Sequence, residues 1–521
     1  MPASEQSLAD EAPALKRLLL QREAELLEAR LMVEKLKLEI ARYKRQKFGA
    51  SSERLTQLAQ LELLVEELES EQARIEEPAA PDAVARKAEP IRPARKALPP
   101  HLPRETLVHE PDAMVGCACA DCGGTLRLLG EDVAEMLEIV PARFKVIRHV
   151  RPKYSCAKCQ AIVPAAAPSR PIARGLAGPG LLAHILVSKF ADHLPLYRQS
   201  DIYAREGVEL ERSTLAGMVG GAAALLDPLV TALERHVIAA DKLHGDDTPV
   251  PVLAPGNGRT KTARLWVYVR DERPMAGQAP PAVWFKYSPD RKGERPQKHL
   301  KNFTGILQAD GYAGFDALYA NGRVSEAACW AHARRKYFDL HASTGSPLAQ
   351  EAMRRIGELY AIEKTIRGKP AAQRRQARQE QAAQKLVEFK QWMDRTLAQT
   401  SSKSELAKAV MYSHKRWAAL TRYADDGRIE MDNNAAEREL RVVALGRKNW
   451  LHAGSDAGGE RAAAIYSLIG SAKLNGLNPE AYLRHVLKRI ADQPINRVDE
   501  LLPWNVAAEL DRETADERLA A

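Results

Sequence analysis

Three acidic side chains, far apart in the chain, have the types and settings that hold divalent metal ions. Asp246 in "LHGDDTPVPVL" and Asp310 in "GILQADGYAGF" lie at the edges of two apolar segments that we expect to be neighbouring strands, and Glu437 in "MDNNAAERELR" lies on an expected helix. Carboxylate oxygens suit hard cations such as Mg²⁺. Two such ions about 4 Å apart can stabilise both the attacking and the leaving oxygen of a phosphodiester displacement. The pattern therefore predicts metal-dependent phosphodiester chemistry.

Neighbouring acids compete for two of these roles. Asp247 directly follows the first acid, Glu439 points roughly opposite Glu437 on a helix, and Glu460 in "GGERAAA" stands at another expected helix start. Glu437 by itself is also compatible with an ordinary helix face, paired with Arg441 four residues later. Sequence periodicity does not exclude these alternatives.

The cysteines form a second candidate metal site. Cys119 and Cys122 make one C-x-x-C pair, and Cys156 and Cys159 make another. Four thiolates in two such pairs can bind one tetrahedral Zn²⁺ in a closed structural site, with Cys117 as a substitute for Cys119. The alternative is a set of reduced core cysteines, because disulfides are rare in the cytosol.

The segment "LPLYRQSDIYAREGVELERSTLAGMV", residues 194–219, predicts a helix-turn-helix with its turn at Gly207. We expect Ser213 to cap the second helix. The apolar residues expected on one face of the first helix are Tyr197, Ile202 and Tyr203. The residues expected to contact DNA at the exposed start of the second helix are Arg212, Ser213 and Thr214. An ordinary helical hairpin is the alternative.

The segment "CWAHARRKYF" follows the second acid. Its Cys329 and His332 have a C-x-x-H spacing compatible with zinc, but no second ligand pair is nearby. We expect His332 to lie beside the active site and to contact a phosphate; the alternative is a packed histidine. The other basic residues expected to contact phosphates are Arg334, Arg335, Lys336, Arg438, Arg441 and Lys448.

The elements that position these residues divide the chain into several parts. Leu19, Leu26, Val33 and Ile40 recur every seven residues, which predicts a short coiled coil. Residues rich in proline, alanine and charge follow as a linker. The predicted order is 1–75 coiled coil, 76–104 linker, 105–170 zinc-binding ribbon, 171–236 helix-turn-helix domain, 237–470 catalytic domain with a helical insertion at 343–427, and 471–521 helical C-terminal region. The fold class is therefore multidomain α+β.

Composition favours a nucleic-acid partner. The chain of 521 residues carries a formal net charge of +9, and 45% of its residues are hydrophobic, enough to bury cores. The first residues do not resemble a signal peptide, and no apolar run has the roughly 18 residues that read as a membrane-spanning helix. We therefore expect a cytoplasmic, nucleoid-associated protein without a membrane partner.

Taken together, these motifs resemble those of the insertion-sequence-66 family of transposases, over almost the whole chain. The resemblance rests on "KFGASSERL", the cysteine pairs, "LPLYRQSDIYAREGVELERSTL", "DDTPV", "QADGYAGF", "CWAHARRK", "MDNNAAERELR" and "GRKNWLHAGSDAGGERAAAIYSLI", in that order. Family members commonly have Asp-Glu-Thr where this chain has Asp246-Asp247-Thr248. This departure leaves the first acid unchanged but makes the choice between the two aspartates less secure.

The resemblance implies an RNase-H-like catalytic fold with a DDE triad of Asp246, Asp310 and Glu437 that binds two Mg²⁺ ions. It implies cleavage at the 3′ ends of an insertion sequence and transfer of those ends into target DNA. It also implies that small accessory proteins of the same element can take part. We expect the coiled coil to pair protomers into at least a dimer, and the Zn²⁺ ribbon and helix-turn-helix to bind the terminal repeats. The alternatives are a DNA-binding regulator with an inactive nuclease-like domain, and a metal-dependent nuclease that does not join.

Overall fold

The computed structural model divides into two compact units, Met1–Ala97 and Leu98–Ala521. In the second unit it describes residues 169–519 except 174, 255, 257, 258 and 321, with side chains only to 512. It also describes Phe144, Val146 and two short strands, β1 (Lys153–Ser155) and β2 (Ile162–Pro164). The predicted coiled coil, the linker and the cysteines of the predicted ribbon lie outside the described residues. β1 and β2 pair antiparallel and bracket the second C-x-x-C pair.

A five-stranded mixed sheet lies at the centre of the described region, in the order β5-β4-β3-β6-β7. Its strands are β3 (Lys242–Val252), β4 (Lys261–Arg270), β5 (Ala282–Ser288), β6 (Gly305–Gln308) and β7 (Val324–Ala327). β4 runs antiparallel to both β3 and β5, whereas β6 runs parallel to β3 and β7 runs parallel to β6. The patterns of the first four strands were apparent in the sequence. β7, "VSEA", was missed because it is short and half polar.

The two strands nearest the predicted acids separate soon after they pair. β3 and β6 are paired only from Lys242 with Ile306 to His244 with Gln308, while β3 continues along β4 to Val252. Asp246 therefore lies in the middle of a long strand, and the expectation that it lies at a strand end is wrong. β3 can contain Pro249 and Pro251 because β4 is its only named strand neighbour there.

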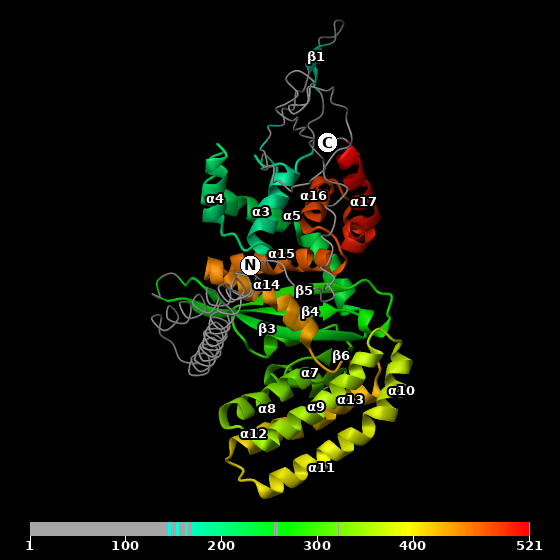
Figure 1. Ribbon diagram of the computed structural model, residues 1–521. Helices are drawn as coiled ribbons and strands as arrows, with labels where there is room; N and C mark the ends of the chain where they lie inside the picture. The colour runs from blue at the N-terminus through cyan, green and yellow to red at the C-terminus, as the bar shows by residue number, and fades with distance from the viewer. Residues whose placement is uncertain are drawn as a thin grey trace, which may run out of the picture. The chain divides into compact units, whose positions relative to one another are not determined.

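Helices from both ends of this region share one hydrophobic core with the sheet. They are α3 (Pro179–Phe190), α4 (Leu196–Arg205), α5 (Arg212–Ile238), α14 (Asn434–Trp450), α15 (Asp456–Leu474), α16 (Pro479–Arg489) and α17 (Pro503–Leu519). Figure 1 shows α14 crossing the sheet at β4 and β3, and α15 lying along β5. The hydroxyls of Ser467 and Ser471 on α15 accept hydrogen bonds from the backbone N–H groups of Phe285 and Val283. α15 therefore covers the outer edge of β5, which would otherwise expose unpaired donors.

Short helical elements connect the strands. They are η2 (Arg273–Met275), α6 (Glu294–His299), η3 (Ala313–Phe315) and α7 (Asp316–Ala320), with η4 (Ile495–Leu501) before the last helix. Trp266 of β4 packs edge-on against Phe315 of η3 and against His299 at the end of α6. Both faces of the central strands are thus covered, which explains why β4 is buried almost throughout.

Six helices between β7 and α14 form a second hydrophobic core (Figure 1). They are α8 (Trp330–Thr344), α9 (Pro347–Ile366), α10 (Ala371–Gln381), α11 (Ala383–Gln399), α12 (Glu405–Lys415) and α13 (Trp417–Asp425). Trp330 stacks on Phe389 at its centre. The break between α9 and α10 falls at the predicted "RGKP", where Gly368 has φ +79°. Helix begins at Trp330, well before the expected residue 343.

The predicted helix-turn-helix segment does fold as two helices, α4 and α5, with Gly207 at φ +77° between them. Glu211, not Ser213, is the N-cap of α5, so the capping prediction is wrong. The Ser213 hydroxyl instead donates to the Glu211 carboxylate at 3.3 Å. Tyr197 is 47% exposed, whereas Tyr203 is buried. α5 is long and apolar enough to cross a membrane by length and composition, yet Leu215, Leu226, Leu229 and Leu233 are buried in the shared core.

Candidate active site

The three predicted acids come together from three different elements. Asp246 lies on β3, Asp310 follows β6 by two residues, and Glu437 lies in the first turn of α14. The pKa of Asp246 is raised to about 7, first because the carboxyl is buried, and then because the negative charges of Asp310, Asp247 and Glu437 act on it. Charges that shift a pKa in this way must lie close to the group they affect. The fold therefore concentrates negative charge around Asp246.

Asp247 is buried beside Asp246 but has cationic partners of its own. Arg291 donates from Nε and Nη2 to Asp247 Oδ1 at 3.0 and 2.8 Å, and Arg264 Nη1 lies 3.0 Å from Oδ2. Burial raises the pKa of Asp247, while these two guanidinium groups act to lower it. Arg291 also lies 4.0 Å from Asp310. The charge of Asp247 is thus already compensated, which favours Asp246 as the metal ligand.

The two competing glutamates lie elsewhere. Glu439 acquires a pKa of about 7, chiefly because it is buried, in an environment that includes Arg438, Lys473 and Asp271. Glu460 is exposed on α15, near Tyr287. Neither is among the charges that shift the pKa of Asp246. Of the three glutamates, Glu437 is the one beside the two aspartates.

A buried asparagine connects the helix of Glu437 to the strand of Asp246. Asn433, fully buried, is the N-cap of α14. Its Nδ2 donates to the carbonyl of Gly245 at 2.9 Å, which fixes the orientation of the amide. Its Oδ1 therefore accepts from His244 Nδ1 at 3.0 Å. The start of α14 is thus bonded to the two residues that precede Asp246.

A second set of contacts extends this network to β6. Glu430 Oε1 lies 3.0 Å from Lys242 Nζ and 3.2 Å from His244 Nε2. The Gln308 side chain bonds to both the backbone N–H and the carbonyl of Glu430. Burial alone would raise the pKa of Glu430, but Lys242 and His244 hold it well below its ordinary value. The segment that leads to Glu437 is therefore tied to both strands that lead to the aspartates.

The helices between β7 and α14 support the loop that carries Asp310 and the segment that leads into the helix of Glu437. Arg416 donates to the carbonyl of Gly311 at 2.8 Å, and a Cβ at Gly311 would lie only 2.2 Å from that guanidinium. A side chain directly after Asp310 would therefore displace the Arg416 guanidinium from this contact. Arg378, fully buried, donates to the carbonyl of Ile429 at 3.0 Å and forms two bonds to Glu363. Such buried charges are stable only when paired and hydrogen-bonded.

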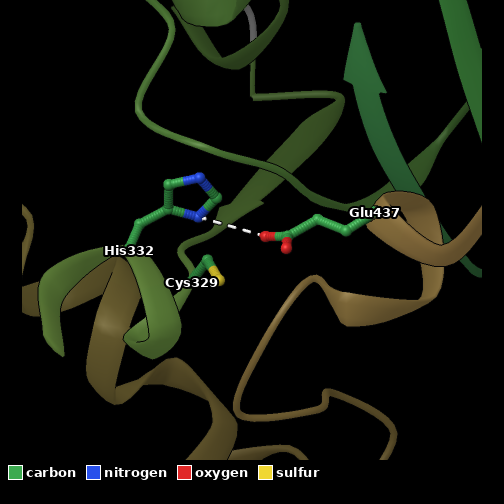
Figure 2. Close-up of side chains that lie close together, drawn as sticks. All are labelled: Cys329, His332 and Glu437. Carbon is green, nitrogen blue, oxygen red and sulfur yellow. Dashed lines mark ion pairs between the residues drawn. The ribbon is translucent and has the colours of Figure 1, made fainter. Parts of the chain in front are cut away.

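His332 lies beside the third acid (Figure 2). Its Nδ1 is 3.6 Å from Glu437 Oε1, and Cys329, the N-cap of α8, lies next to both. Burial raises the pKa of the Cys329 thiol to about 12, although the backbone N–H groups of Asn433 and His332 counteract this. The structure therefore brings His332 to the acids, as the sequence predicted.

The helix residues predicted to contact DNA, most of them basic, are all exposed. They are Arg212, Ser213 and Thr214 on α5, Arg334, Arg335 and Lys336 on α8, and Arg438, Arg441 and Lys448 on α14. Helical spacing puts Arg441 and Lys448 on the same face of α14 as Glu437. Arg198 of α4 donates to Asn449 near the end of α14 at 3.4 Å. A row of cations thus runs from the acids toward the predicted helix-turn-helix.

The donor set of the acidic cluster fits a hard divalent cation. Asp246, Asp310 and Glu437 offer oxygen atoms, and the pKa of Asp246 is raised first by burial and then by the negative charge of its acidic neighbours, which a bound cation would neutralise. These three residues could hold Mg²⁺, and exchangeable positions would remain for substrate and water. The sequence did not predict roles for His244, Glu430 and Arg291. His244 and Glu430 could have been noticed, because each is a polar residue that interrupts an apolar pattern before Asp246 or Glu437.

Comparisons with known proteins identify the family. Residues 174–461 match the model "Transposase IS66 family", and residues 467–504 match "IS66 C-terminal element". Residues 117–160 match "zinc-finger binding domain of transposase IS66", and 35–107 match a leucine-zipper model described as "Transposase C of IS166 homeodomain". The chain belongs to the IS66 family of transposases.

Several relatives come from Sinorhizobium fredii (strain NBRC 101917 / NGR234). The uncharacterized protein y4hP is 43% identical over 493 residues, which cover 90% of this chain and 88% of that protein. The uncharacterized protein y4jD is 42% identical over 421 residues, 79% of this chain and 82% of that protein.

Proposed function

We propose that this chain is a DDE transposase that cleaves the 3′ ends of an insertion sequence and joins them to target DNA. The proposal rests mainly on one observation: Asp246, Asp310 and Glu437 lie close together. The negative charges of Asp310 and Glu437 contribute to the raised pKa of the buried Asp246. The sheet supports an RNase-H-like fold, because three antiparallel strands are followed by two strands parallel to the first. In this proposal Asp246 lies on the first strand of the RNase-H-like fold, Asp310 follows the fourth strand, and Glu437 lies on a later helix.

In the proposed reaction, Asp246, Asp310 and Glu437 hold two Mg²⁺ ions, which supply activation of a water and stabilisation of the leaving oxygen. Water breaks the phosphodiester at the element's end and leaves a free 3′-OH. That hydroxyl then attacks a target phosphodiester at the same acids, and the target's 3′ oxygen leaves. No covalent bond to the protein forms. His332 and the exposed arginines of α8 and α14 hold the phosphates.

The remaining parts have roles in binding DNA and in assembly. A zinc ribbon of Cys119, Cys122, Cys156 and Cys159 (or Cys117 for Cys119) and the helix pair α4–α5 bind the terminal repeats, with Arg212, Ser213 and Thr214 at the contact. The N-terminal coiled coil pairs protomers so that two ends are held together. Small accessory proteins of the element join this assembly, which acts in the cytoplasm at the nucleoid.

Strand-transfer assays test the proposal. The full chain is incubated with Mg²⁺ and a donor DNA that carries both flanks of its own gene. Wild type is expected to cleave 3′ ends and join them, and Asp246→Asn, Asp310→Asn and Glu437→Gln are expected to do neither while still binding DNA. Glu460→Gln is the matched control and should stay active, because Glu460 is exposed on α15.

The possible results separate the competing functions. Cleavage without joining would identify a nuclease. Binding of the flanks without any cleavage, also in the presence of the accessory proteins, would identify a regulator with an inactive domain. An active Glu437→Gln with an inactive Glu460→Gln would move the third acid to α15.

A further inference from the structure

A second group of metal-ligating atoms lies next to the acidic triad. One ligand atom each from Cys329, His332 and Glu437 lie within 4.8 Å of one another. His332 Nδ1 is buried, has no hydrogen-bond partner, and lies 3.6 Å from Glu437 Oε1. Figure 2 shows the thiol and the imidazole, from the start of α8, beside the carboxylate from α14. An imidazole nitrogen without a partner at this position is available to a metal ion.

The spacing is close to that of a tetrahedral zinc site. Zinc binds sulfur at about 2.3 Å and nitrogen or oxygen at roughly 2.0–2.2 Å, so two ligand atoms on one ion lie roughly 3.4–3.7 Å apart. The imidazole and carboxylate already have this separation. The sulfur lies within 4.8 Å of the other two ligand atoms, so it must approach them by at most about 1 Å. Water can take the fourth position.

The donor types select a different metal from the one that the triad selects. A thiolate and an imidazole favour zinc or cobalt, whereas Mg²⁺ prefers oxygen ligands. Glu437 belongs to both groups. The Glu437 oxygen that faces His332 would bind the zinc-like ion and would be lost to Mg²⁺, so occupation of one site opposes occupation of the other.

We propose that Cys329, His332 and Glu437 bind a zinc-like cation, and that this ion inhibits the enzyme by withdrawing Glu437 from the Mg²⁺ site. The cation displaces the thiol proton of Cys329, which passes to solvent as the metal–sulfur bond forms. The inhibition rests on the proposed transposase function. The binding of the cation is independent of that function, because it requires only the side chains of Cys329, His332 and Glu437.

Binding is tested on the full chain with Co²⁺. Wild type and Cys329→Ser are equilibrated with Co²⁺ under identical conditions, and bound metal and absorbance are measured. Wild type is expected to hold one more equivalent and to show additional thiolate-to-cobalt absorbance. The cysteines of the predicted ribbon contribute equally to both proteins and cancel in the difference. Equal uptake and equal spectra would overturn the site.

Inhibition is tested by adding Zn²⁺ to the Mg²⁺-dependent cleavage assay. Cys329→Ser keeps a hydrogen-bond acceptor for Asn433 N–H, so its activity without zinc is expected to match wild type. Half-inhibition is expected to need at least about tenfold more Zn²⁺ in this variant, because one ligand is lost. Cys329→Ala serves the same purpose if the serine variant does not fold.

The two assays fail in different ways. If neither protein cleaves DNA, the proposed function is at fault, and the Co²⁺ difference still decides the binding site. If wild type binds the extra Co²⁺ but Zn²⁺ inhibits both proteins equally, the competition for Glu437 is wrong.

Discussion

His244 and Asn433 form a fully buried hydrogen bond of 3.0 Å between the strand that carries Asp246 and the helix that carries Glu437. The same asparagine donates to Gly245, directly before Asp246. The relative position of the first and third acids is therefore set by one side chain at the start of α14. A catalytic group misplaced by about 1 Å can cost on the order of 100-fold in rate.

Replacing Asn433 is the direct test of this role. Asn433→Ala is expected to reduce strand transfer by about 100-fold and to raise the Mg²⁺ concentration needed for half-maximal rate, while DNA affinity stays unchanged. Partial rescue by Mn²⁺ would distinguish a displaced ligand from a loss of folded protein. Asn434→Ala is the matched control. Asn434 is the next residue, and its side chain is only half-buried and makes no hydrogen bond in the described structure. A variant with weak DNA binding but a normal Mg²⁺ requirement would contradict the positioning role.

Glu430→Gln is expected to destabilise the protein in a pH-dependent manner. The pKa of Glu430 lies well below its ordinary value of 4.5 because Lys242 and His244 act against the effect of burial. The stability that it contributes is therefore present above about pH 4.5 and is lost as the pH falls through the lower folded value. The substitution should cost about 3 kcal/mol at pH 7, since it leaves Lys242 buried without its partner, and less at pH 4.

Urea unfolding of wild type and Glu430→Gln at the two pH values measures this difference. Glu405→Gln provides the control: Glu405 pairs with Lys408 in an exposed salt bridge, and such pairs contribute little. A loss that did not change between pH 7 and pH 4 would show that the charge of Glu430 is not the cause.

Asp246→Asn is expected to stabilise the protein in Mg²⁺-free buffer while it abolishes activity. The pKa of Asp246 is raised to about 7 from an ordinary value of 3.8, first by burial and then by the charge of Asp310. Folding thus opposes ionisation, so wild type loses stability as the pH rises from about 4 to 7. The amide avoids this loss and should be more stable by about 2 kcal/mol at pH 8, with the two proteins converging near pH 4.

Asp247→Asn should not give this stabilisation, because it leaves Arg291 and Arg264 without their carboxylate partner. Thermal unfolding with and without Mg²⁺ completes the comparison. Added Mg²⁺ should raise the midpoint of wild type and leave Asp246→Asn almost unchanged. If Mg²⁺ stabilised wild type and Asp246→Asn equally, Asp246 would not be a ligand of the ion.

The row of cations on α14 predicts how DNA binding responds to salt. Arg441→Gln and Lys448→Gln should each weaken binding at all sequences and reduce the slope of log affinity against log salt by about 1. Arg497→Gln is the control, because Arg497 is exposed on η4 and paired with Glu500. Fluorescence anisotropy with a labelled terminal repeat at several salt concentrations measures the slopes. Slopes identical to that of wild type would exclude α14 from the DNA path.

The sequence by itself located the chemistry, because residue type and local spacing are sufficient for that. Apolar segments beside Asp246 and Asp310 predicted β3 and β6, and the C-x-x-C pairs predicted a zinc-finger segment that the family comparison supports. Asp246, Asp310 and Glu437 were candidates from their positions beside apolar runs. Local spacing could not distinguish Asp246 from Asp247, or Glu437 from Glu439 and Glu460.

Only the tertiary structure decided which carboxylates face one another. β3 and β6 are paired only as far as His244, two residues before Asp246, and Asp247 is paired with Arg291 and Arg264. Asn433, Glu430 and Gln308 act across more than a hundred residues of chain. Which residues they contact depends on how α14 and the segment before it pack against the sheet. Neither residue type nor periodicity contains that information.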